Sequence, residues 1–179
     1  IGPTGVQTSG VISASVDASD ADGDTLTISY DWYVDGFLVA SLPSLSGSAY
    51  FDKGDLVHLE VTVSDGEDES APMTSNTVLV INTPPTGPTV AVNPYEPVTG
   101  EDSISCSLIG EGDDLDGDDL TYTYSWERDG ETWDGDTDTT VYPNDTVLAE
   151  NLKSYEVWTC LITPHDEEEA GSPGTDEAV

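Results

Sequence analysis

Apolar and polar residues alternate at every second position along several short segments of the chain. The alternation is clearest at residues 26–34 and 120–126, where Leu, Ile, Tyr, Trp and Val are separated mainly by Thr, Ser and Asp. Shorter runs at 12–16 and 57–63 follow the same pattern. A period of two is typical of half-buried β-strands, and no segment shows a sustained helical period. The pattern therefore predicts an all-β protein.

Turn residues fit this interpretation. Asp35-Gly36 and Asp129-Gly130 each follow a predicted strand directly, and Asp-Gly is a strong signal for a two-residue hairpin turn. Ser, Thr, Gly and Asp interrupt the chain about every ten residues, which is the spacing of sandwiches with about seven strands. We therefore expect antiparallel strands joined by short connections.

The sequence also contains an internal repeat of about ninety residues. Asp20–Gly36 aligns without a gap on Asp114–Gly130, at an offset of 94 residues. Further along, Val61–Asp65 aligns on Ile162–Asp166 at an offset of 101, so the second repeat has seven extra residues. Each repeat contains a full set of predicted strands, which indicates two modules in tandem.

A proline-rich segment, Asn82–Pro88, separates the repeats and has the composition of a stiff linker. We therefore predict one domain over residues 1–83 and a second over residues 84–179. Ile1–Thr4 is similar to the end of such a linker, and Val179 falls inside the predicted last strand. We expect both ends to be cut from a longer array.

The two cysteines occupy matching positions in the second repeat. Cys106 lies twenty residues before Trp126 and aligns with Ile12, whereas Cys160 lies in the penultimate strand and aligns with Leu59. An immunoglobulin-type sandwich has this arrangement, with a disulfide between strands B and F packed on a tryptophan of strand C. Two free core thiols in a reducing compartment are the alternative; the disulfide implies an oxidising, extracellular or periplasmic setting. The predicted fold is two tandem Ig-like antiparallel β-sandwiches of about seven strands each.

A family resemblance rests on three motifs of this chain. The run Asp-x-Asp-Gly-Asp-x-Leu-Thr-x-x-x-x-Trp, the strand Val61–Gly66 and the Asn-Thr-Pro-Pro linker resemble the PKD-like, cadherin-like and related Ig-like modules of bacterial cell-surface proteins. The resemblance covers nearly the whole chain, twice. It implies an Ig-like fold and membership of a secreted extracellular array, and it indicates no particular ligand. The first repeat departs from the second in lacking the cysteines and in its short first strand.

The charge of the chain excludes several classes of function. Its 37 acidic residues are opposed by only three Lys and Arg residues, which gives a formal net charge of −34. Binding to nucleic-acid phosphates requires a basic surface, and an anionic lipid surface would repel this chain. A hydrophobic content of 36% is too high for a disordered acidic tail, and no apolar stretch is long enough for direct membrane insertion.

Many of the acidic residues lie in two loops of each repeat that an Ig-like sandwich brings to the same end. Alternate Asp residues around a Gly turn can direct carboxylates to one point, and Ca²⁺ requires six to eight oxygen ligands. We therefore predict structural Ca²⁺ bound in these loops. The candidate ligands are Asp20, Asp22, Asp24, Asp114, Asp116 and Asp118.

Bound Ca²⁺ at a module junction would stiffen the array, as in cadherin-like proteins. Two further roles of the acidic loops stay open. Asp and Gly make good turns, and surplus charge keeps a long surface protein soluble. Adaptation to high salt also favours an acidic surface with very little Lys.

Catalytic motifs are missing from the sequence. His58 is at an outward strand position and His165 is in an acidic segment, with no nucleophile at a recognisable spacing. We therefore predict a protein that is not an enzyme. Trp133 follows the Asp129-Gly130 turn, and an exposed Trp there could contact a sugar or a protein, unless it folds back over its own sheet.

The leading functional hypothesis is a structural module of a repetitive secreted protein, acting as a rigid stalk, an adhesin spacer or a fibre-forming unit. Its partners would be neighbouring copies or repeats of the same protein, because an unpaired sandwich edge can accept a strand. The alternative is an adhesion module that binds a glycan or a cell-surface protein through exposed loops and Trp133.

Overall fold

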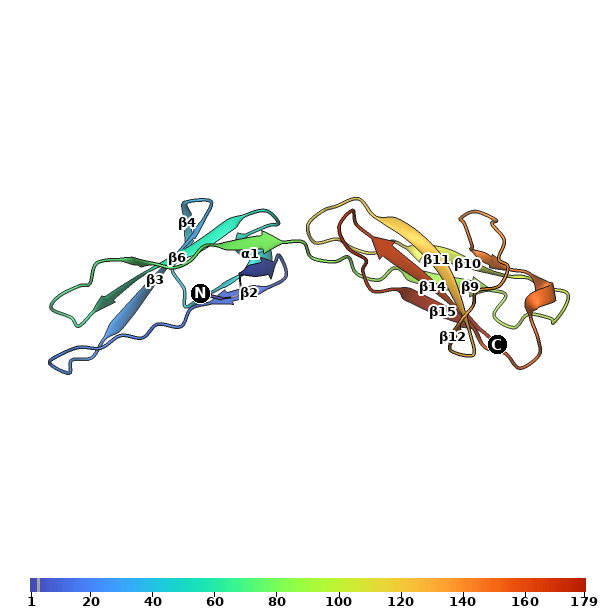
Figure 1. Ribbon diagram of the computed structural model, residues 1–179, viewed down its shortest axis with the longest axis horizontal. Helices are drawn as coiled ribbons and strands as arrows, with labels where there is room; N and C mark the ends of the chain where they lie inside the picture. Colours follow the sequence, from blue (N-terminus) through green and yellow to red (C-terminus); the bar gives the residue numbers. More distant parts are fainter. Residues whose placement is uncertain (3) are drawn as a thin grey trace. The chain divides into compact units, whose positions relative to one another are not determined.

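The structure is a computed structural model that describes residues 1–2 and 4–179 (Figure 1). The chain divides into two compact units, Ile1–Thr83 and Pro84–Val179, each with its own hydrophobic core. Strands dominate both units; among the described residues the helical elements are the single turns α1 (Gly47–Tyr50) and η1 (Ala149–Asn151). The all-β prediction is confirmed. Across the described residues, no helix is both long and apolar enough to cross a membrane.

The first unit packs a large sheet against a strand pair. The strands of the large sheet, in spatial order, are β1 (Gly5–Gln7), β8 (Val78–Ile81), β6 (Leu56–Ser64), β3 (Thr27–Val34) and β4 (Phe37–Ala40), with β7 (Met73–Thr74) also on β6. The strand pair is β2 (Val11–Ser13) with β5 (Ser44–Ser46). Side chains from both layers, among them Ile12, Leu45 and Trp32, are fully buried between them. The first unit is therefore a β-sandwich.

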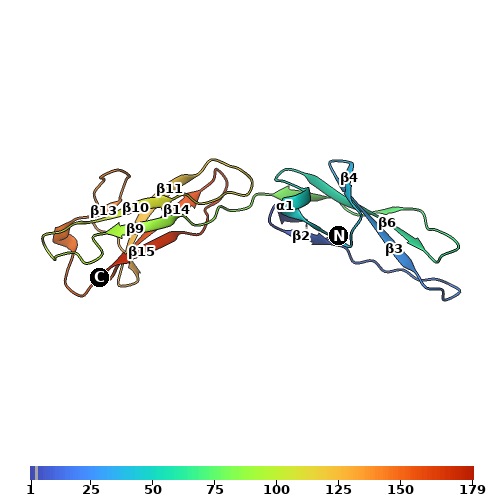
Figure 2. The ribbon, with the colours of Figure 1, turned by 180° about the vertical axis from the view of Figure 1, so that it is seen from behind.

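The second unit is a sandwich of two sheets (Figure 2). One sheet consists of β13 (Thr146–Val147), β10 (Ile104–Gly110) and β9 (Thr89–Asn93). The other consists of β12 (Glu131–Thr132), β11 (Thr121–Arg128), β14 (Trp158–His165) and β15 (Gly174–Ala178). This grouping of strands A, B and E against C′, C, F and G is the Ig arrangement.

Each sandwich is built around a tryptophan at matching positions of β3 and β11. Trp32 and Trp126 are almost completely buried. The indole N–H of Trp32 donates to the carbonyl of Leu42 at 2.8 Å, and that of Trp126 donates to the carbonyl of Asn144 at 3.0 Å. A buried indole needs such an acceptor, and both repeats supply one from the segment that crosses between the sheets.

Both predicted Asp-Gly turns are confirmed. Asp35 and Gly36 have φ of 49° and 82°, and Asp129 and Gly130 have φ of 54° and 82°. Two consecutive positive φ values are what a twisted two-residue hairpin requires, and Gly adopts them without strain. The turns join β3 to β4 and β11 to β12.

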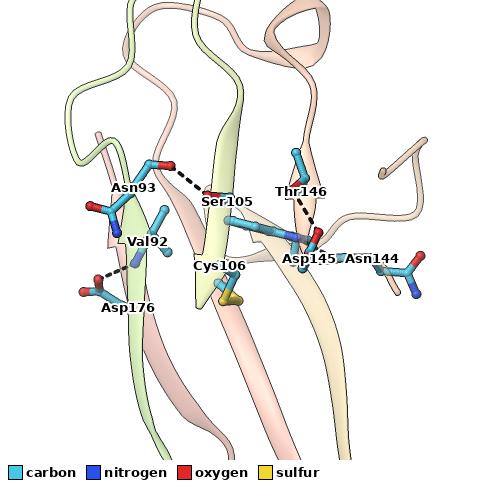
Figure 3. The surroundings of a disulfide bond; sticks show 10 residues. Val92, Asn93, Ser105, Cys106, Asn144, Asp145, Thr146 and Asp176 are labelled. Atoms are coloured by element: carbon cyan, nitrogen blue, oxygen red, sulfur yellow. Dashed lines mark hydrogen bonds between the residues drawn. A yellow bond between two sulfur atoms is a disulfide. The ribbon is translucent and has the colours of Figure 1, made fainter. Parts of the chain in front are cut away.

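The Cys106–Cys160 disulfide is present and joins β10 to β14, that is, one sheet to the other. Cys160 is fully buried, and Cys106 is 3% exposed. Figure 3 shows the disulfide beside Val92 of β9, whose N–H donates to the carboxylate of Asp176 at 2.8 Å. The disulfide is therefore part of the core of the second unit.

The predicted strand at 12–16 is shorter than its sequence pattern suggests. β2 ends at Ser13, whereas β10, its counterpart in the second unit, continues to Gly110. β10 is paired with β9 along most of its length, whereas on the edge of β2 that faces away from β5 the described residues supply one bridge, between Gly2 and Ser13. An alternating pattern gives a strand only where a neighbour accepts its backbone hydrogen bonds.

Candidate metal centre

The Asp-rich loop of the second unit is organised by one carboxylate. Asp114 Oδ1 accepts the backbone N–H groups of Asp116 at 2.9 Å and Asp118 at 3.1 Å. Gly117, between them, has φ of 80°, a conformation that favours Gly. The loop therefore turns around the Asp114 side chain, and the next two alternate carboxylates come back towards it.

This turn brings three carboxylates together. Oxygens of Asp114, Asp116 and Asp118 lie within 4.8 Å of one another, and all three residues are half-buried. Asp114 Oδ2 is shielded from solvent and has no hydrogen-bond partner within the described chain. A buried carboxylate oxygen without a donor is unfavourable, and like charges at this separation repel unless a cation lies among them. The donor set of three carboxylates suits a hard cation such as Ca²⁺.

The matching loop of the first unit has the same turn, but two of its three carboxylates are more exposed than those of the second unit. Asp20 Oδ1 accepts the N–H groups of Asp22, Gly23 and Asp24 at 2.8, 2.7 and 3.1 Å. However, Asp22 and Asp24 are exposed. Among the described residues, the group of three or more close carboxylates is that of the second unit, and the triad of Asp20, Asp22 and Asp24 does not form one.

Backbone N–H groups lower the pKa values of two carboxylates in the acidic loops of the first unit. Hydrogen bonds from the N–H groups of Asp24 and Asp22 lower the pKa of Asp20, against partial burial and the nearby charge of Asp65, which raise it. The pKa of Asp65 is lowered in the same way by the N–H groups of Asp68 and Glu67. Both carboxylates are therefore stabilised in their charged form by the loops that they hold.

Strand pairing brings the two acidic loops of the second unit to one end, as predicted. Thr121, at the start of β11, is paired with His165, at the end of β14. The loop after His165 is organised by Asp166, which is 7% exposed and accepts N–H groups of Glu168 at 2.7 Å and Glu169 at 2.5 Å. Asp166 is thus another acid that fixes a turn.

Sequence reasoning did not identify Asp145, a carboxylate of the second unit that accepts hydrogen bonds from five donors. It is 1% exposed and accepts the N–H groups of Thr140, Val141 and Tyr142 at 2.7–2.8 Å. The hydroxyls of Thr140 and Thr146 donate to it at 3.0 and 2.9 Å; Figure 3 shows the bond from Thr146. Burial alone would raise the pKa of Asp145, but these donors outweigh it and lower the pKa to about 2.

Trp133 is half-buried. It packs against the core of the second unit and makes an edge-to-face contact with Trp158, with ring centroids 5.0 Å apart. The guanidinium of Arg128 lies 4.7 Å from the centre of the Trp133 ring. With one neighbour at its edge and a cation over its ring, Trp133 is packed as a structural residue, and this position does not favour sugar stacking.

The two histidines belong to different units, and each contacts a side chain of the neighbouring strand. His58 stacks on Tyr33 of the adjacent strand, with ring centroids 5.0 Å apart. His165 is the last residue of β14, and its Nε2 is 2.9 Å from the hydroxyl of Thr123. Each contact is a cross-strand pair that stabilises a sheet.

Comparison with known proteins identifies no family. No protein-family model matches the chain, and no curated protein matches it. Solved structures with some similarity to this chain include a Ca²⁺-stabilized adhesin that helps an Antarctic bacterium reach out and bind ice, with 17% identity and a TM-score of 0.39. The match covers 98% of this chain but 45% of the adhesin chain, so this chain spans less than half of that protein.

Two animal proteins also match. Murine CEACAM1b has 14% identity and a TM-score of 0.37, over 98% of this chain and 94% of that chain. The amphioxus IgVJ-C2 molecule has 14% identity and a TM-score of 0.29, over 97% and 96% of the two chains. At these values the similarity assigns no function, and the fold rests on the sheets described above.

Proposed function

We propose that this chain is a non-enzymatic structural module of a secreted cell-surface protein, and that the Asp114 loop binds Ca²⁺. Its role is to extend and stiffen an array of Ig-like domains, as a stalk or an adhesin spacer. The proposal of two tandem domains, 1–83 and 84–179, is consistent with the two compact units and their separate cores.

The observation that carries the calcium proposal is the triad itself. Three carboxylates converge within 4.8 Å, and one of their oxygens is buried without a donor. Backbone hydrogen bonds hold Asp114 Oδ1 in the turn, whereas Asp114 Oδ2 receives none. Asp114, Asp116 and Asp118 would hold the ion, with carbonyl oxygens and water completing its coordination.

An extracellular location is supported by the disulfide and the charge. A buried intersheet disulfide persists in an oxidising compartment. Millimolar Ca²⁺ binding, in the range of extracellular modules, would suit a site with three carboxylates from the protein. The net charge of −34 further disfavours anionic partners such as nucleic acid.

Calcium is expected to stabilise the second unit selectively. Free Ca²⁺ at ten times its Kd should add about 1.4 kcal/mol to the free energy of unfolding, which raises the Tm by about 7 °C in a domain of this size. Calorimetry of the full chain, in calcium and then in EDTA, measures the shift for each unit. Scattering from the same samples tests whether calcium also reduces flexibility of the chain.

Matched variants separate a metal site from simple loss of acidic charge. Asp116→Asn with Asp118→Asn should abolish the calcium response, whereas Asp22→Asn with Asp24→Asn, which removes two exposed acids from the corresponding loop, should leave it intact. Equal melting curves for the wild-type protein with and without EDTA would reject the calcium proposal and indicate that these acids serve as solvated turns.

A further inference from the structure

The segment Pro84–Pro88 (the entry segment) leads into β9 and packs on the second unit without forming a strand. Pro85 and Pro88 are buried, whereas Thr86 and Gly87 between them are exposed. Figures 1 and 2 show the segment reaching the second unit at the end where β11 begins and β14 ends. This is the end of the sandwich that carries the candidate metal centre.

Thr86 joins the entry segment to the Asp-rich loop by three hydrogen bonds. Its N–H donates to the carbonyl of Asp113 at 2.8 Å, and its hydroxyl donates to the same carbonyl at 3.1 Å. In the other direction, the N–H of Asp113 donates to Thr86 Oγ1 at 2.8 Å. Proline has no N–H, so within the entry segment only Thr86 and Gly87 can donate from the backbone. Thr86 therefore holds the loop through its backbone and its side chain together.

Close packing on two carbonyl groups encloses the entry segment from both sides. A Cβ added to Gly112 would lie 2.1 Å from the carbonyl oxygen of Thr86, and one added to Gly171 would lie 2.1 Å from that of Pro85. A real Cβ cannot come so close to an oxygen, so both places have room for glycine alone. The entry segment is therefore held between the loop that precedes β11 and the loop that follows β14.

These contacts fix the start of the loop that carries the carboxylates. Asp113 directly precedes Asp114, whose side chain organises the turn by accepting the N–H groups of the next two alternate Asp residues. Gly112 donates its N–H to the hydroxyl of Tyr122 at 3.1 Å, which ties the loop to β11. A loop that is already held in place loses less conformational entropy when it binds an ion.

We infer that Thr86 is a positioning residue for the Asp114 triad, and that docking of the entry segment and binding of Ca²⁺ stabilise each other. This inference rests on the proposed calcium site. Thr86 acts through the backbone of Asp113 and not as a ligand: it fixes the direction from which the Asp114 side chain enters the turn. Because coupling between two binding events is reciprocal, an ion at the triad should hold the entry segment as strongly as the segment favours the ion.

Removal of the Thr86 hydroxyl tests the inference. Thr86→Val keeps the size of the side chain and the backbone N–H but loses both hydrogen bonds of the hydroxyl. In calorimetric titration of the full chain with CaCl₂, this variant should bind Ca²⁺ about fivefold more weakly, as expected for the loss of exposed hydrogen bonds. Thr86→Ser keeps the hydroxyl and should bind within about twofold of the wild type. Equal weakening by both variants would show that the hydroxyl is not the cause and would overturn the inference.

Amide hydrogen exchange in EDTA tests the same contact without calcium. The N–H groups of Asp116 and Asp118 report whether the turn is formed, because both donate to the Asp114 carboxylate. In Thr86→Val these amides should exchange about fivefold faster than in the wild type, and in Thr86→Ser they should not. A lower Tm with unchanged exchange and unchanged calcium affinity would show that Thr86 only stabilises the fold, which contradicts a positioning role.

Calcium should in turn protect the entry segment of the wild-type protein. Saturating Ca²⁺ should slow the exchange of the Thr86 and Asp113 amides about fivefold, because these two N–H groups form the bonds between segment and loop. The protection should disappear when Asp116 and Asp118 are both replaced by Asn. Binding of calcium without protection of these two amides would show that the segment and the ion are not coupled.

A pair of glycine variants locates the contact. Gly112→Ala places a Cβ against the carbonyl oxygen of Thr86 and should weaken calcium binding as Thr86→Val does. Gly110→Ala is the matched control, since a Cβ there would lie 3.6 Å from Thr89, which is an ordinary contact. Equal effects of the two alanine variants would argue against a specific role of the entry segment.

The outcomes separate this inference from the calcium proposal itself. If the wild type binds Ca²⁺ and Thr86→Val binds it equally well, the inference is wrong and the calcium proposal stands. If the wild type shows no calcium binding in the titration, the calcium proposal is wrong and the coupling to an ion falls with it. The exchange of Asp116 and Asp118 in EDTA then decides whether Thr86 positions the turn.

Discussion

Replacing Cys106 and Cys160 together by Ala is expected to lower the free energy of unfolding of the second unit by about 4 kcal/mol. The disulfide joins residues 54 positions apart, and a cross-link over a loop of this length restricts the unfolded chain by about that amount. Small extracellular domains depend on such cross-links because their cores are limited. Denaturant unfolding of the full chain, followed for each unit, measures the loss.

The first unit supplies the control for this prediction. It has Ile12 and Leu59 at the positions that align with the cysteines, and both are fully or almost fully buried. Reduction of the wild-type protein with a phosphine should therefore destabilise the second unit and leave the first unchanged. A comparable loss in both units, or in neither, would contradict a specific stabilising role of the disulfide.

Asp145→Ala is expected to destabilise the second unit by about 3 kcal/mol. The substitution leaves the N–H groups of Thr140, Val141 and Tyr142 without their common acceptor in a buried position. Asp145→Asn keeps the size and one acceptor oxygen but loses the charge, so its effect should be smaller. Asp136→Ala, a change at an exposed acid of the same connection, is the matched control and should have little effect.

The Asp145 contribution should also depend on pH. Its pKa of about 2 in the folded protein is below the value of about 3.9 for an unfolded Asp, so the charged form stabilises the fold. The contribution, about 2 kcal/mol, is complete above about pH 5 and is lost as the pH falls from about 4 towards 2. The stability difference between wild type and Asp145→Asn should narrow over this range. A difference that stays constant down to pH 2 would show that charge is not the cause.

The structure changes the interpretation of the acidic composition. Several carboxylates act as acceptors for backbone N–H groups of turns, and matching positions do so in both repeats. Asp35 accepts the N–H of Leu56 at 3.1 Å, and Asp129 accepts that of Val157 at 2.9 Å. For these acids, turn formation accounts for the choice of Asp. The three carboxylates of the Asp114 loop are different. The turn needs only the Asp114 side chain as an acceptor, yet the carboxylates of Asp116 and Asp118 also lie close to it.

Local sequence patterns predicted most of the fold. Period-two alternation identified β3, β6 and β11, because one face of each strand is buried and the other is not. The Asp-Gly turns were predictable because positive φ depends on the residue itself. The alignment of the repeats placed Cys106 and Cys160 in the core and on facing sheets, where the disulfide forms.

The candidate site was only partly predictable. Both loops have the sequence Asp-x-Asp-Gly-Asp, and both turn around their first Asp, yet the carboxylates converge in the second. The difference coincides with packing from a distant segment, since Thr86 is bonded to Asp113, directly before the triad. Likewise, Asp145 could not be recognised, because its donors are gathered by the fold of a segment without periodic pattern.

The sequence by itself determined what depends on neighbours along the chain: the strand periods, the hairpin turns, the repeat and the aligned cysteines. Tertiary structure alone decided what depends on a partner distant in sequence. It decided that β2 ends at Ser13 and that the Asp114 triad converges. The physical reason is that backbone edges and buried charges are stabilised only by the groups that face them in space.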